Sequence, residues 1–392
     1  MAVSIKSQSQ NKGEKQVLLL GAGYCARALI PSFIAQNYKV VATTRSETKA
    51  QELKKLGTSP LIYKGQNTRE LKESVGQSEI ILSSIPPESS GDPFLNACPA
   101  SIAKIMKNVR WAGYLSATSV YGDRKGGWVY EDELLRPKTQ RGKNRATAEI
   151  QWLETGLPIH VFRLAGIYGP GRSNFARLRE GTSRAVIKTG HVVNRIHVDD
   201  IVDLIFKSIK RPNPVTVYNV ADGHPAAPQD VLNFSADLID VERPPQINHN
   251  STEISDVARS FYTETKKVDI SRAQSELGWT PHYDTYRKGL MAILKKEHGP
   301  QDSVWLSGVF NVPKKDLKKV MNFLPRHIQL SAAENGCLFF RVSQDTHNPH
   351  NFNVFECFDS AFSYQRHQSR VKNSEWSQVT QNCQRDYDII GL

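Results

Sequence analysis

Residues 17–29 read VLLLGAGYCARAL, and this stretch decides the fold of the first part of the chain. Four apolar residues typical of a buried strand lead into a glycine-rich turn, and the residues after the turn have the apolar spacing of a helix. The turn has the spacing G-x-G-x-x-A: Gly21 permits the tight turn, Gly23 lets the backbone approach a pyrophosphate, and Ala26 allows close packing of helix on strand. We therefore expect a βαβ unit that binds a dinucleotide through this turn, including Tyr24. The alternative is a glycine-rich turn without a ligand.

The end of the expected second strand (39–43) indicates which dinucleotide is bound. NAD-binding proteins carry an acidic residue in this region, which holds the ribose 2′-hydroxyl. This chain has Thr44 and Arg45 and no carboxylate, and a cation beside hydroxyl groups suits a 2′-phosphate, so we expect NADP in preference to NAD. The alternative for Arg45 is a solvated surface cation. Ser83, at the end of the expected strand 79–84, is a further expected cofactor contact.

Strand and helix patterns alternate from Val17 to about Thr216. The expected strands are near-continuous apolar runs, which is typical of a parallel sheet covered by helices on both faces. From there to about residue 296 the pattern becomes more mixed. The expected strands lie at 17–20, 39–43, 61–63, 79–84, 111–117 and 159–164.

Composition and charge exclude several classes of protein. The chain has 392 residues and a net charge of +12, but Lys and Arg are scattered and no nucleic-acid-binding signature is present, so no nucleic-acid partner is expected. The 5 cysteines are far apart, which argues against disulfides and a metal site and for a reducing compartment. No apolar run approaches the ~20 residues of a membrane span, and residues 1–15 form a polar tail without a signal sequence. We therefore expect a disordered tail, no membrane partner and a cytoplasmic protein.

The stretch EHGPQDS (297–303) is expected to be a linker to a second module at 304–392. This module has the pattern of a small α+β domain with its own apolar faces. It is too short to bury a large core alone, and such modules often complete their core by pairing. The expected elements are a helix at 313–333, strands at 337–343 and 351–358, a helix near 359–370 and a last strand at 387–391.

The first ~296 residues resemble the extended short-chain dehydrogenase/reductases, the NAD(P)-dependent epimerase/dehydratase family. The resemblance implies an α/β fold, in which a Rossmann-type parallel sheet with a small substrate lobe occupies 16–296 and the lobe is built mainly from residues after Leu164. The motifs that carry it occur in the family's order: LLLGAGYCA (18–26), YLSATSVYGD (114–123), FRLAGIYGPGR (162–172), RIHVDDIVDLI (195–205), YNVADG (218–223) and ELGWTP (276–281).

The residues that carry the family's proton chemistry are changed in this chain. In the family, a Tyr-x-x-x-Lys pair and a Ser or Thr transfer the proton and bind the nicotinamide ribose. The stretch QRGKNRATAE (140–149) places Arg141 at the tyrosine position and Arg145 at the lysine position. Ala117 stands at the hydroxyl position, between Ser116 and Thr118. Arg cannot act as a general base near neutral pH because its pKa stays above about 12.

Other roles are expected for these residues. Arg145 would hold the ribose or a phosphate as a cation, and Arg141 would bind an anionic group of the substrate. Tyr121 of the VYG motif is the nearest tyrosine that could replace the missing one, although the tyrosine of this motif is usually structural. Ser116 and Thr118 are the candidate hydroxyl groups. The pattern resembles an atypical subgroup that keeps the cofactor fold and lacks the usual tyrosine.

Residues 301–392 resemble the antibiotic biosynthesis monooxygenase family, which includes quinol monooxygenases. The resemblance implies an α+β ferredoxin-like fold, the dimeric α/β barrel, whose sheet pairs with a second copy, and therefore a homodimer. The matching stretches are RHIQLSAAENGCLFFRVSQDTHNPHNFNVFECF (326–358), HQSRVKNSEWSQV (367–379) and RDYDI (385–389).

Members of this family oxygenate quinol-type substrates with O₂ and require no metal or flavin. Such a site needs a base, a hydrogen-bonding group and an apolar pocket, and the resemblance indicates His367 and Trp376, with His327 and Glu356 as further candidates. The alternative for His327 is a packing or capping residue. Glu356 lies in an apolar strand, where an unpaired carboxylate is costly, so it faces the pocket or pairs across the dimer.

We therefore expect a two-domain redox protein. An NADP-dependent reductase- or epimerase-like domain is fused to a cofactor-free quinol-type monooxygenase-like domain, and the fusion suggests a small quinone- or quinol-like substrate. The alternative is an NADPH-binding sensor or regulatory protein whose Rossmann domain is catalytically inactive.

Overall fold

The computed structural model describes residues 15–66, 68–98, 105–254, 259, 261–345 and 348–392. The predicted tail at 1–15 lies outside these residues except for Lys15. The chain divides into two compact units. Unit 1 comprises 1–166, 198–223 and 256–281, and unit 2 comprises 167–197, 224–255 and 282–392.

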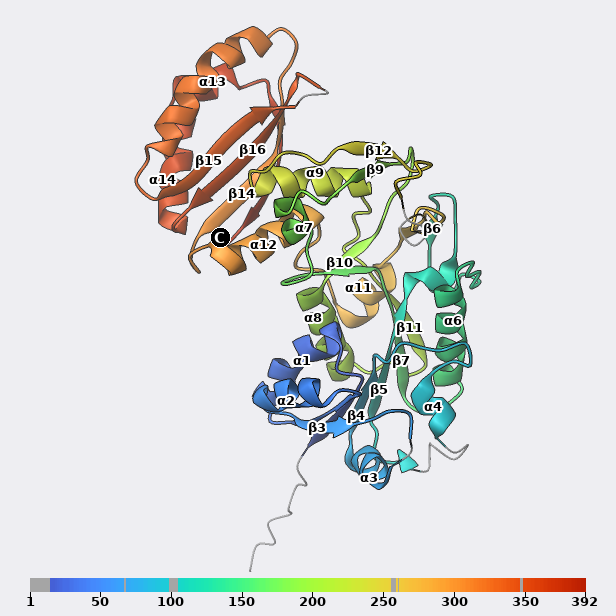
Figure 1. Cartoon of the computed structure of the whole chain (residues 1–392). Helices are drawn as coiled ribbons and strands as arrows, with labels where there is room; N and C mark the ends of the chain where they lie inside the picture. Colours follow the sequence, from blue (N-terminus) through green and yellow to red (C-terminus); the bar gives the residue numbers. More distant parts are fainter. Residues whose placement is uncertain (1–14, 67, 99–104, 255–258, 260, 346–347) are drawn as a thin grey trace, which may run out of the picture. The chain divides into compact units, whose positions relative to one another are not determined.

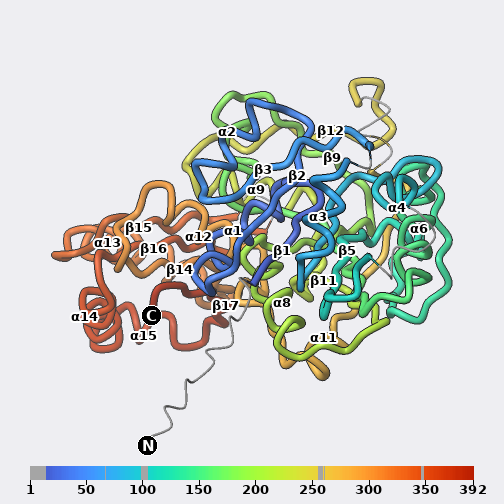
Figure 2. The backbone as a smooth tube through the Cα atoms, turned by 90° about the horizontal axis from the view of Figure 1, so that it is seen from below, coloured from blue at the N-terminus to red at the C-terminus, as the bar shows by residue number. Residues whose placement is uncertain are grey.

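Unit 1 is built on a 7-stranded sheet whose strands are all parallel, in the order β11-β7-β5-β4-β1-β2-β3 (Figures 1 and 2). This confirms the predicted Rossmann-type sheet and the positions of its six predicted strands; β11 is a strand that the sequence did not predict. The strands are β1 (Gln16–Leu20), β2 (Lys39–Thr44), β3 (Ser59–Ile62), β4 (Ile80–Ser83), β5 (Trp111–Ala117), β7 (Ile159–Leu164) and β11 (Thr216–Val220).

Helices cover both faces of this sheet. Figure 1 shows α1, α2 and α8 on one side and α4 and α6 on the other. On the α6 side, the ring of Trp152 stacks between those of Phe94 and Tyr114, at centroid distances of 6.2 and 6.1 Å. The helices are α1 (Tyr24–Ala35), α2 (Glu47–Lys55), α3 (Arg69–Gln77), α4 (Pro93–Ala97), η1 (Thr118–Tyr121), α6 (Gln140–Leu153), α8 (Val198–Lys210) and α11 (Ser271–Leu277); the short strands β6 (Trp128–Val129) and β13 (Lys267–Val268) pair with each other.

Unit 2 joins the small lobe to the C-terminal module. The module is a 4-stranded antiparallel sheet in the order β15-β16-β14-β17, with α13 and α14 on one face, which is the predicted ferredoxin-like arrangement (Figure 1). The sequence did not predict its central strand β14 or the short helix α15. The module contains β14 (Val304–Asn311), α13 (Leu317–Ala332), β15 (Cys337–Gln344), β16 (Asn351–Phe358), α14 (Ala361–Lys372), α15 (Glu375–Val379) and β17 (Gln384–Ile390).

The lobe contributes shorter elements. Its helix α12 lies next to β14 and β17 (Figure 1), and Phe234 of α9 packs on Phe355 of β16. The predicted linker at 297–303 overlaps the end of α12, and only five residues separate this helix from β14. The lobe contains β8 (Gly166–Tyr168), α7 (Phe175–Arg179), β9 (Ala185–Ile187), β10 (Arg195–His197), α9 (Pro228–Leu238), β12 (Gln246–Asn248) and α12 (Tyr286–His298).

The two faces of the C-terminal sheet pack against different partners. On the inner face, Leu306 and Val354 belong to one apolar cluster with Trp376 of α15. On the outer face, Phe355 belongs to another cluster, with Leu290 of α12, to which Trp305 and Ile390 also contribute. The outer face of the sheet is therefore packed against helices of the same chain.

Two classes of site are absent from the part of the chain that the structure describes. No group of three or more His, Cys, Asp or Glu side chains there could hold a metal ion. No helix among the described residues is long and apolar enough to span a bilayer.

Candidate functional site

The glycine-rich turn has the geometry expected for a nucleotide. Gly21 has a φ of 84°, and a Cβ there would lie 3.0 Å from a side-chain carbon of Ile85, so the turn itself requires glycine. Gly23 is different: its φ is −78°, and a Cβ would meet no atom within 4 Å. The packing of the protein therefore does not require glycine at position 23, whereas a pyrophosphate approaching the backbone does. Ala26 is 1% exposed and packs helix α1 against the sheet.

The start of α1 is compatible with a bound phosphate. Its first turn contains no acidic residue, and its N-cap, Gly23, has no capping side chain. Negative charge is favoured at such a helix terminus. Tyr24, the first residue of the helix, is half-buried beside the turn.

Arg45 follows β2, and its guanidinium is exposed and forms no hydrogen bond or ion pair with any described residue. Thr44 accepts a hydrogen bond from the Ser46 backbone N–H at 3.3 Å, and Ser46 in turn caps α2. Thus a cation and hydroxyl groups lie together at the end of β2, as predicted.

Ser83, the further predicted cofactor contact, lies at the end of β4. Its side chain is buried, and its hydroxyl donates a hydrogen bond to the Asp92 carboxylate at 3.1 Å.

The two arginines of α6 occupy different environments. Arg141 is exposed, and its side chain has no partner in the described parts of the chain. Arg145 is half-buried, and one of its terminal nitrogens donates to the Leu115 carbonyl at 2.5 Å. Burial raises the pKa of the neighbouring Tyr114, and the Arg145 cation opposes this shift. Arg145 is therefore held against β5, whereas Arg141 is available to a ligand.

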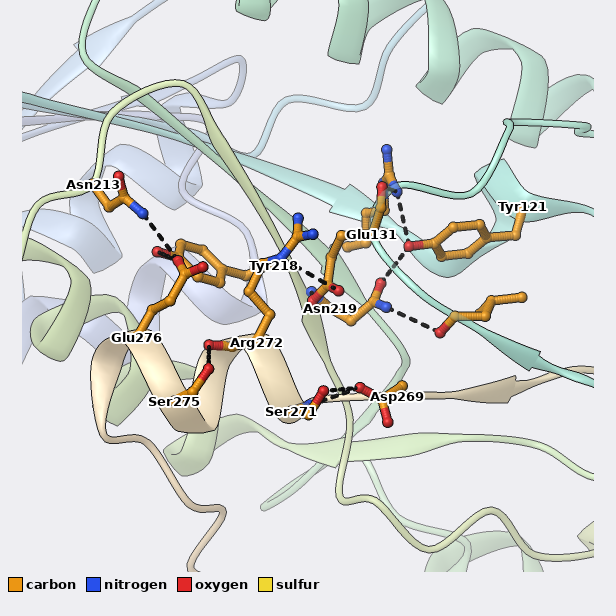
Figure 3. A network of polar contacts seen from close by, with 12 residues as sticks. Tyr121, Glu131, Asn213, Tyr218, Asn219, Asp269, Ser271, Arg272, Ser275 and Glu276 are labelled. Carbon is orange, nitrogen blue, oxygen red and sulfur yellow. Dashed lines mark hydrogen bonds and ion pairs between the residues drawn. The ribbon is translucent and has the colours of Figure 1, made fainter.

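Tyr121 and Ser116, two of the predicted catalytic candidates, belong to a buried hydrogen-bond network. The Tyr121 hydroxyl donates to Asn219 Oδ1 at 2.6 Å and accepts from Arg163 at 2.8 Å (Figure 3). The Ser116 hydroxyl donates to Glu149 at 2.8 Å. Burial raises the pKa of Tyr121 to about 12, although Arg163 opposes this. Both hydroxyl groups thus have fixed structural partners.

The same network continues to the surface of unit 1. The Asn219 backbone N–H donates to Glu131 at 2.9 Å, and Arg272 of α11 lies 3.8 Å from the same carboxylate (Figure 3).

Thr118 is half-buried, and its hydroxyl makes no hydrogen bond to a described residue. Ala117 lies beside it at the end of β5. Of the predicted hydroxyl candidates in unit 1, Thr118 is the one that the fold leaves available.

The structure brings the four predicted residues of the C-terminal module together. The ring of His327 on α13 stacks on Trp376 at a centroid distance of 4.4 Å and an interplanar angle of 7°. The rings of His327 and His367 lie 6.4 Å apart. His367 Nε2 lies 3.7 Å from Glu356 Oε2. All four side chains are buried between the helices and the inner face of the sheet.

Two further residues contact His367 or its partner at this site, and they were not predicted. His367 Nδ1 lies 2.9 Å from Glu334 Oε2, and Arg370 donates to the other oxygen of the same carboxylate. Glu334 begins the E-x-G-C-L-x-F run that carries the family resemblance, so its signal was present in the sequence. The site therefore contains two carboxylates, one on each side of the His367 ring.

Burial dominates the electrostatics of this cluster. It raises the pKa of Glu356 to about 8, and the neighbouring Glu334 adds to this effect. Burial also lowers the pKa of His327 to about 3 and that of His367 below its usual value, although Glu334 opposes the shift at His367. Near neutral pH the cluster thus contains a protonated carboxyl group beside neutral imidazoles, which can exchange protons with a substrate hydroxyl.

Comparison with known proteins identifies relatives for both parts of the chain. Residues 4–95 match the family model Shikimate / quinate 5-dehydrogenase, and residues 306–377 match the family model Antibiotic biosynthesis monooxygenase. Protein YeeZ from Escherichia coli K12 is 26% identical over 286 residues, which cover 69% of this chain and 96% of YeeZ.

Solved structures agree with this assignment. A functionally unknown conserved protein from Silicibacter pomeroyi is 41% identical, with a TM-score of 0.69 over 72% of this chain and 99% of its own. A dTDP-glucose 4,6-dehydratase from Bacillus anthracis, solved in complex with NAD, is 17% identical, with a TM-score of 0.60 over 72% of this chain and 97% of its own. At this identity the second match shows the fold alone.

Proposed function

Over 72% of its length the chain belongs to the same family as the functionally unknown Silicibacter pomeroyi protein, and we propose that it is a two-domain NADP-binding redox protein. Its first domain has the fold of the NAD(P)-dependent epimerases and dehydratases, and its residues 306–377 are an antibiotic biosynthesis monooxygenase domain. The observation that carries the proposal is the convergence of His327, Glu356, His367 and Trp376 in one buried cluster.

The residues of unit 1 fit a nicotinamide dinucleotide. The turn at Gly21 and Gly23 and the first turn of α1 would hold the pyrophosphate. The space beside Gly23, where a Cβ would meet no protein atom, is open for the phosphate groups to approach the backbone. Exposed Arg45 beside Thr44 would hold a 2′-phosphate, which favours NADP over NAD. When bound, NADPH supplies a hydride. The dehydratase with a similar fold was solved with NAD, which supports binding of this class of cofactor.

Proton transfer in unit 1 is restricted by the hydrogen bonds already described. Arg141 cannot be a base, and the Tyr121 hydroxyl is bound by Asn219 and Arg163. A reductase mechanism would therefore use the Thr118 hydroxyl or Arg141 to bind and polarise the substrate, and take its proton from solvent. The same observation favours the second candidate function, an NADPH-binding sensor whose first domain performs no chemistry.

In the C-terminal domain, His367 would remove a proton from the hydroxyl of a quinol-type substrate, and the protonated carboxyl group of Glu356 beside it would donate a hydrogen bond. The resulting anion supplies the electrons that reduce O₂: one oxygen atom enters the substrate, the other leaves as water, and the quinol becomes a hydroxyquinone. Trp376 and His327 would provide an aromatic wall for such a planar substrate. No metal or organic cofactor is needed for this reaction.

The two activities can be coupled through one substrate. The first domain would reduce a quinone to the quinol with one NADPH and one proton, and the second would oxygenate the quinol with one O₂. Purified full-length protein, NADPH and a panel of quinones would then consume NADPH and O₂ in equal amounts. His367→Gln should lower O₂ uptake at least tenfold and leave NADPH binding unchanged.

Cofactor binding separates the two candidate functions. NADPH fluorescence titration should give at least tenfold weaker binding for Arg45→Ala, with a smaller effect on NADH, and no change for the control Lys49→Ala, an exposed cation on α2. Binding without NADPH oxidation on any quinone would support the sensor. Absence of both NADPH binding and O₂ uptake with quinones or quinols would contradict the proposal.

A homodimer and a location in the cytoplasm belong to the same proposal. In this chain α12 and α9 pack on the outer face of the C-terminal sheet, where Phe234 of α9 lies 5.6 Å from Phe355 between ring centroids. A second copy would therefore bind a surface other than the part of the outer face that these helices cover. Analytical ultracentrifugation of the full chain tests the dimer.

A further inference from the structure

His367 lies between two carboxylates that come from different parts of the C-terminal domain. Its Nδ1 lies 2.9 Å from Glu334 Oε2, and its Nε2 lies 3.7 Å from Glu356 Oε2. Glu334 follows α13, whereas Glu356 is on β16 and His367 is on α14. The imidazole side chain is 2% exposed, so these two contacts define its polar surroundings.

Glu334 is held in place by a cation and by the neighbouring helices. Arg370 Nε donates to Glu334 Oε1, and a terminal nitrogen of Arg370 donates to Ser331 Oγ at 2.7 Å. Ser331 Oγ in turn donates to the His327 carbonyl at 2.8 Å. An ionised carboxylate paired with Arg can only accept hydrogen bonds, so the proton of the neutral His367 ring is on Nδ1. The lone pair of Nε2 then faces Glu356.

Other charged or titratable groups also surround this pair. His327 on α13 lies nearest the His367 ring, at 6.4 Å between ring centroids. Arg370 disfavours a second proton on His367, whereas Glu334 favours it. Three further groups respond to Glu356. Burial raises the pKa of Cys337 on β15, Tyr364 on α14 and Tyr387 on β17, and the charge of Glu356 adds to each shift.

Glu334 also reaches the surface of the domain. Together with Arg370 it lines a pocket of about 540 Å³, whose other walls include Arg366 and Ser369 of α14. The Glu334 side chain is 16% exposed, compared with 2% for His367. Glu334 therefore contacts the buried imidazole on one side and lines the surface pocket on the other.

From this geometry we propose that Glu334 is the positioning residue of the C-terminal site and connects His367 to solvent in the pocket. It fixes the ring with Nε2 toward Glu356 and the reacting group. When Nε2 takes a proton from the substrate hydroxyl, the ring becomes an imidazolium ion. The Nδ1 proton then passes to Glu334 and on to solvent, which leaves a neutral ring with its proton on Nε2. When the O–O bond breaks, Nε2 gives this proton to the oxygen that leaves as water, and Glu334 returns a proton from solvent to Nδ1, so the ring regains its Nδ1–H form with no net proton released. This inference rests on the proposed function of the C-terminal domain.

The state of His367 can be measured without any substrate. In full-length protein labelled with ¹⁵N-histidine, the wild type should show His367 as the Nδ1–H tautomer. Glu334→Gln keeps the shape of the side chain and removes its charge, so the pKa of His367 should fall by about one unit or more. Arg370→Lys removes the Nε donor to Glu334 and keeps the positive charge. It should lower the fraction of the Nδ1–H tautomer, but by less than Glu334→Gln does. The control is Glu375→Gln, an exposed carboxylate on α15 that should leave the His367 signals unchanged.

Kinetics provide the second measurement. Because Glu334 does not touch the substrate, Glu334→Gln should lower kcat for O₂ uptake at least tenfold, change KM less than twofold, and move the pH profile with the pKa of His367. The inference would be overturned if His367 kept both its wild-type tautomer and its wild-type pKa in Glu334→Gln and in Arg370→Lys. If the wild type takes up no O₂ with any quinol, the proposed function fails, whereas the NMR result still decides whether Glu334 positions His367.

Discussion

Glu149 of α6 and Arg163 of β7 form an ion pair of 2.5 Å in the interior of unit 1. Their side chains are 2% and 5% exposed, and Arg163 also donates to the Tyr121 hydroxyl. Glu149 accepts a further hydrogen bond from Ser116. This pair therefore holds α6, β5 and β7 together. Unit 1 uses these polar groups for structure.

Removing one member of this pair should be strongly destabilising. We expect Arg163→Met to lower the free energy of unfolding by about 3–5 kcal/mol, because it leaves a buried carboxylate without its partner. Equilibrium urea unfolding measures this. The control is Arg69→Met, which breaks the exposed pair of Arg69 with Glu73 and should cost about 1 kcal/mol or less. Equal effects of the two substitutions would show that the buried pair does not stabilise unit 1.

The two glycines of the turn should respond differently to substitution. Gly23→Val should weaken NADPH binding at least tenfold and change stability by about 1 kcal/mol or less, because its side chain enters open space. Gly21→Val should cost about 1–3 kcal/mol in backbone strain alone, since φ is 84° and Ile85 is close. Titration with NADPH and thermal unfolding measure the two effects. Unchanged NADPH affinity in Gly23→Val would argue against a nucleotide at this turn.

Much of the first domain could be predicted because its signals are local. The apolar run at 17–20 and the spacing of Gly21 and Gly23 lie within a few residues of each other, and they gave both the parallel sheet and the first turn. Strand β14 was not predicted because it begins directly after the Gly/Pro break at 297–303, and because Ser307 and Gly308 interrupt its apolar run. Periodicity locates an element only where its boundaries are recognised.

The roles of site residues were harder to predict because they depend on distant partners. Tyr121 and Ser116 are candidate proton donors in sequence, but Asn219 and Glu149 determine their role in the fold. The C-terminal residues were identified from family resemblance, and no local pattern indicated that they would meet. Glu334 lies in one of the stretches that carry the resemblance, but its role depends on His367, which is 33 residues away in the sequence.

Stability should depend on pH through Glu356. Its pKa is about 8 in the folded protein against an ordinary value of 4.5, so the folded state keeps a proton that the unfolded state releases. This contribution is fully present below pH 4.5 and is lost as the pH rises through 8. The free energy of unfolding of the wild type should therefore fall relative to Glu356→Gln between pH 5 and 9, by at most about 5 kcal/mol. Urea unfolding at several pH values measures this difference, and the exposed Glu375→Gln should show none. A constant difference for Glu356→Gln would mean that Glu356 is ionised in the folded protein.

The outer face of the C-terminal sheet should unfold together with the lobe. Phe355 is 3% exposed, its ring lies 5.6 Å from that of Phe234, and the Arg341 guanidinium lies 5.3 Å above it. We expect Phe355→Ala to lower the free energy of unfolding, measured by urea unfolding, by about 3–5 kcal/mol. Phe362→Ala, at a position that is 68% exposed, should lower it by about 0.5 kcal/mol or less.

A double-mutant cycle decides whether the two parts of unit 2 are coupled. Phe234→Ala and Phe355→Ala should show an interaction energy of about 0.5–1.5 kcal/mol, because the two rings are in contact. Hydrogen exchange should show α12 and β16 losing protection together in the Phe355 variant, since one apolar cluster contains both. If the two substitutions are additive and β16 loses protection while α12 keeps it, the module is an independent domain behind a linker, as the 297–303 stretch alone would suggest.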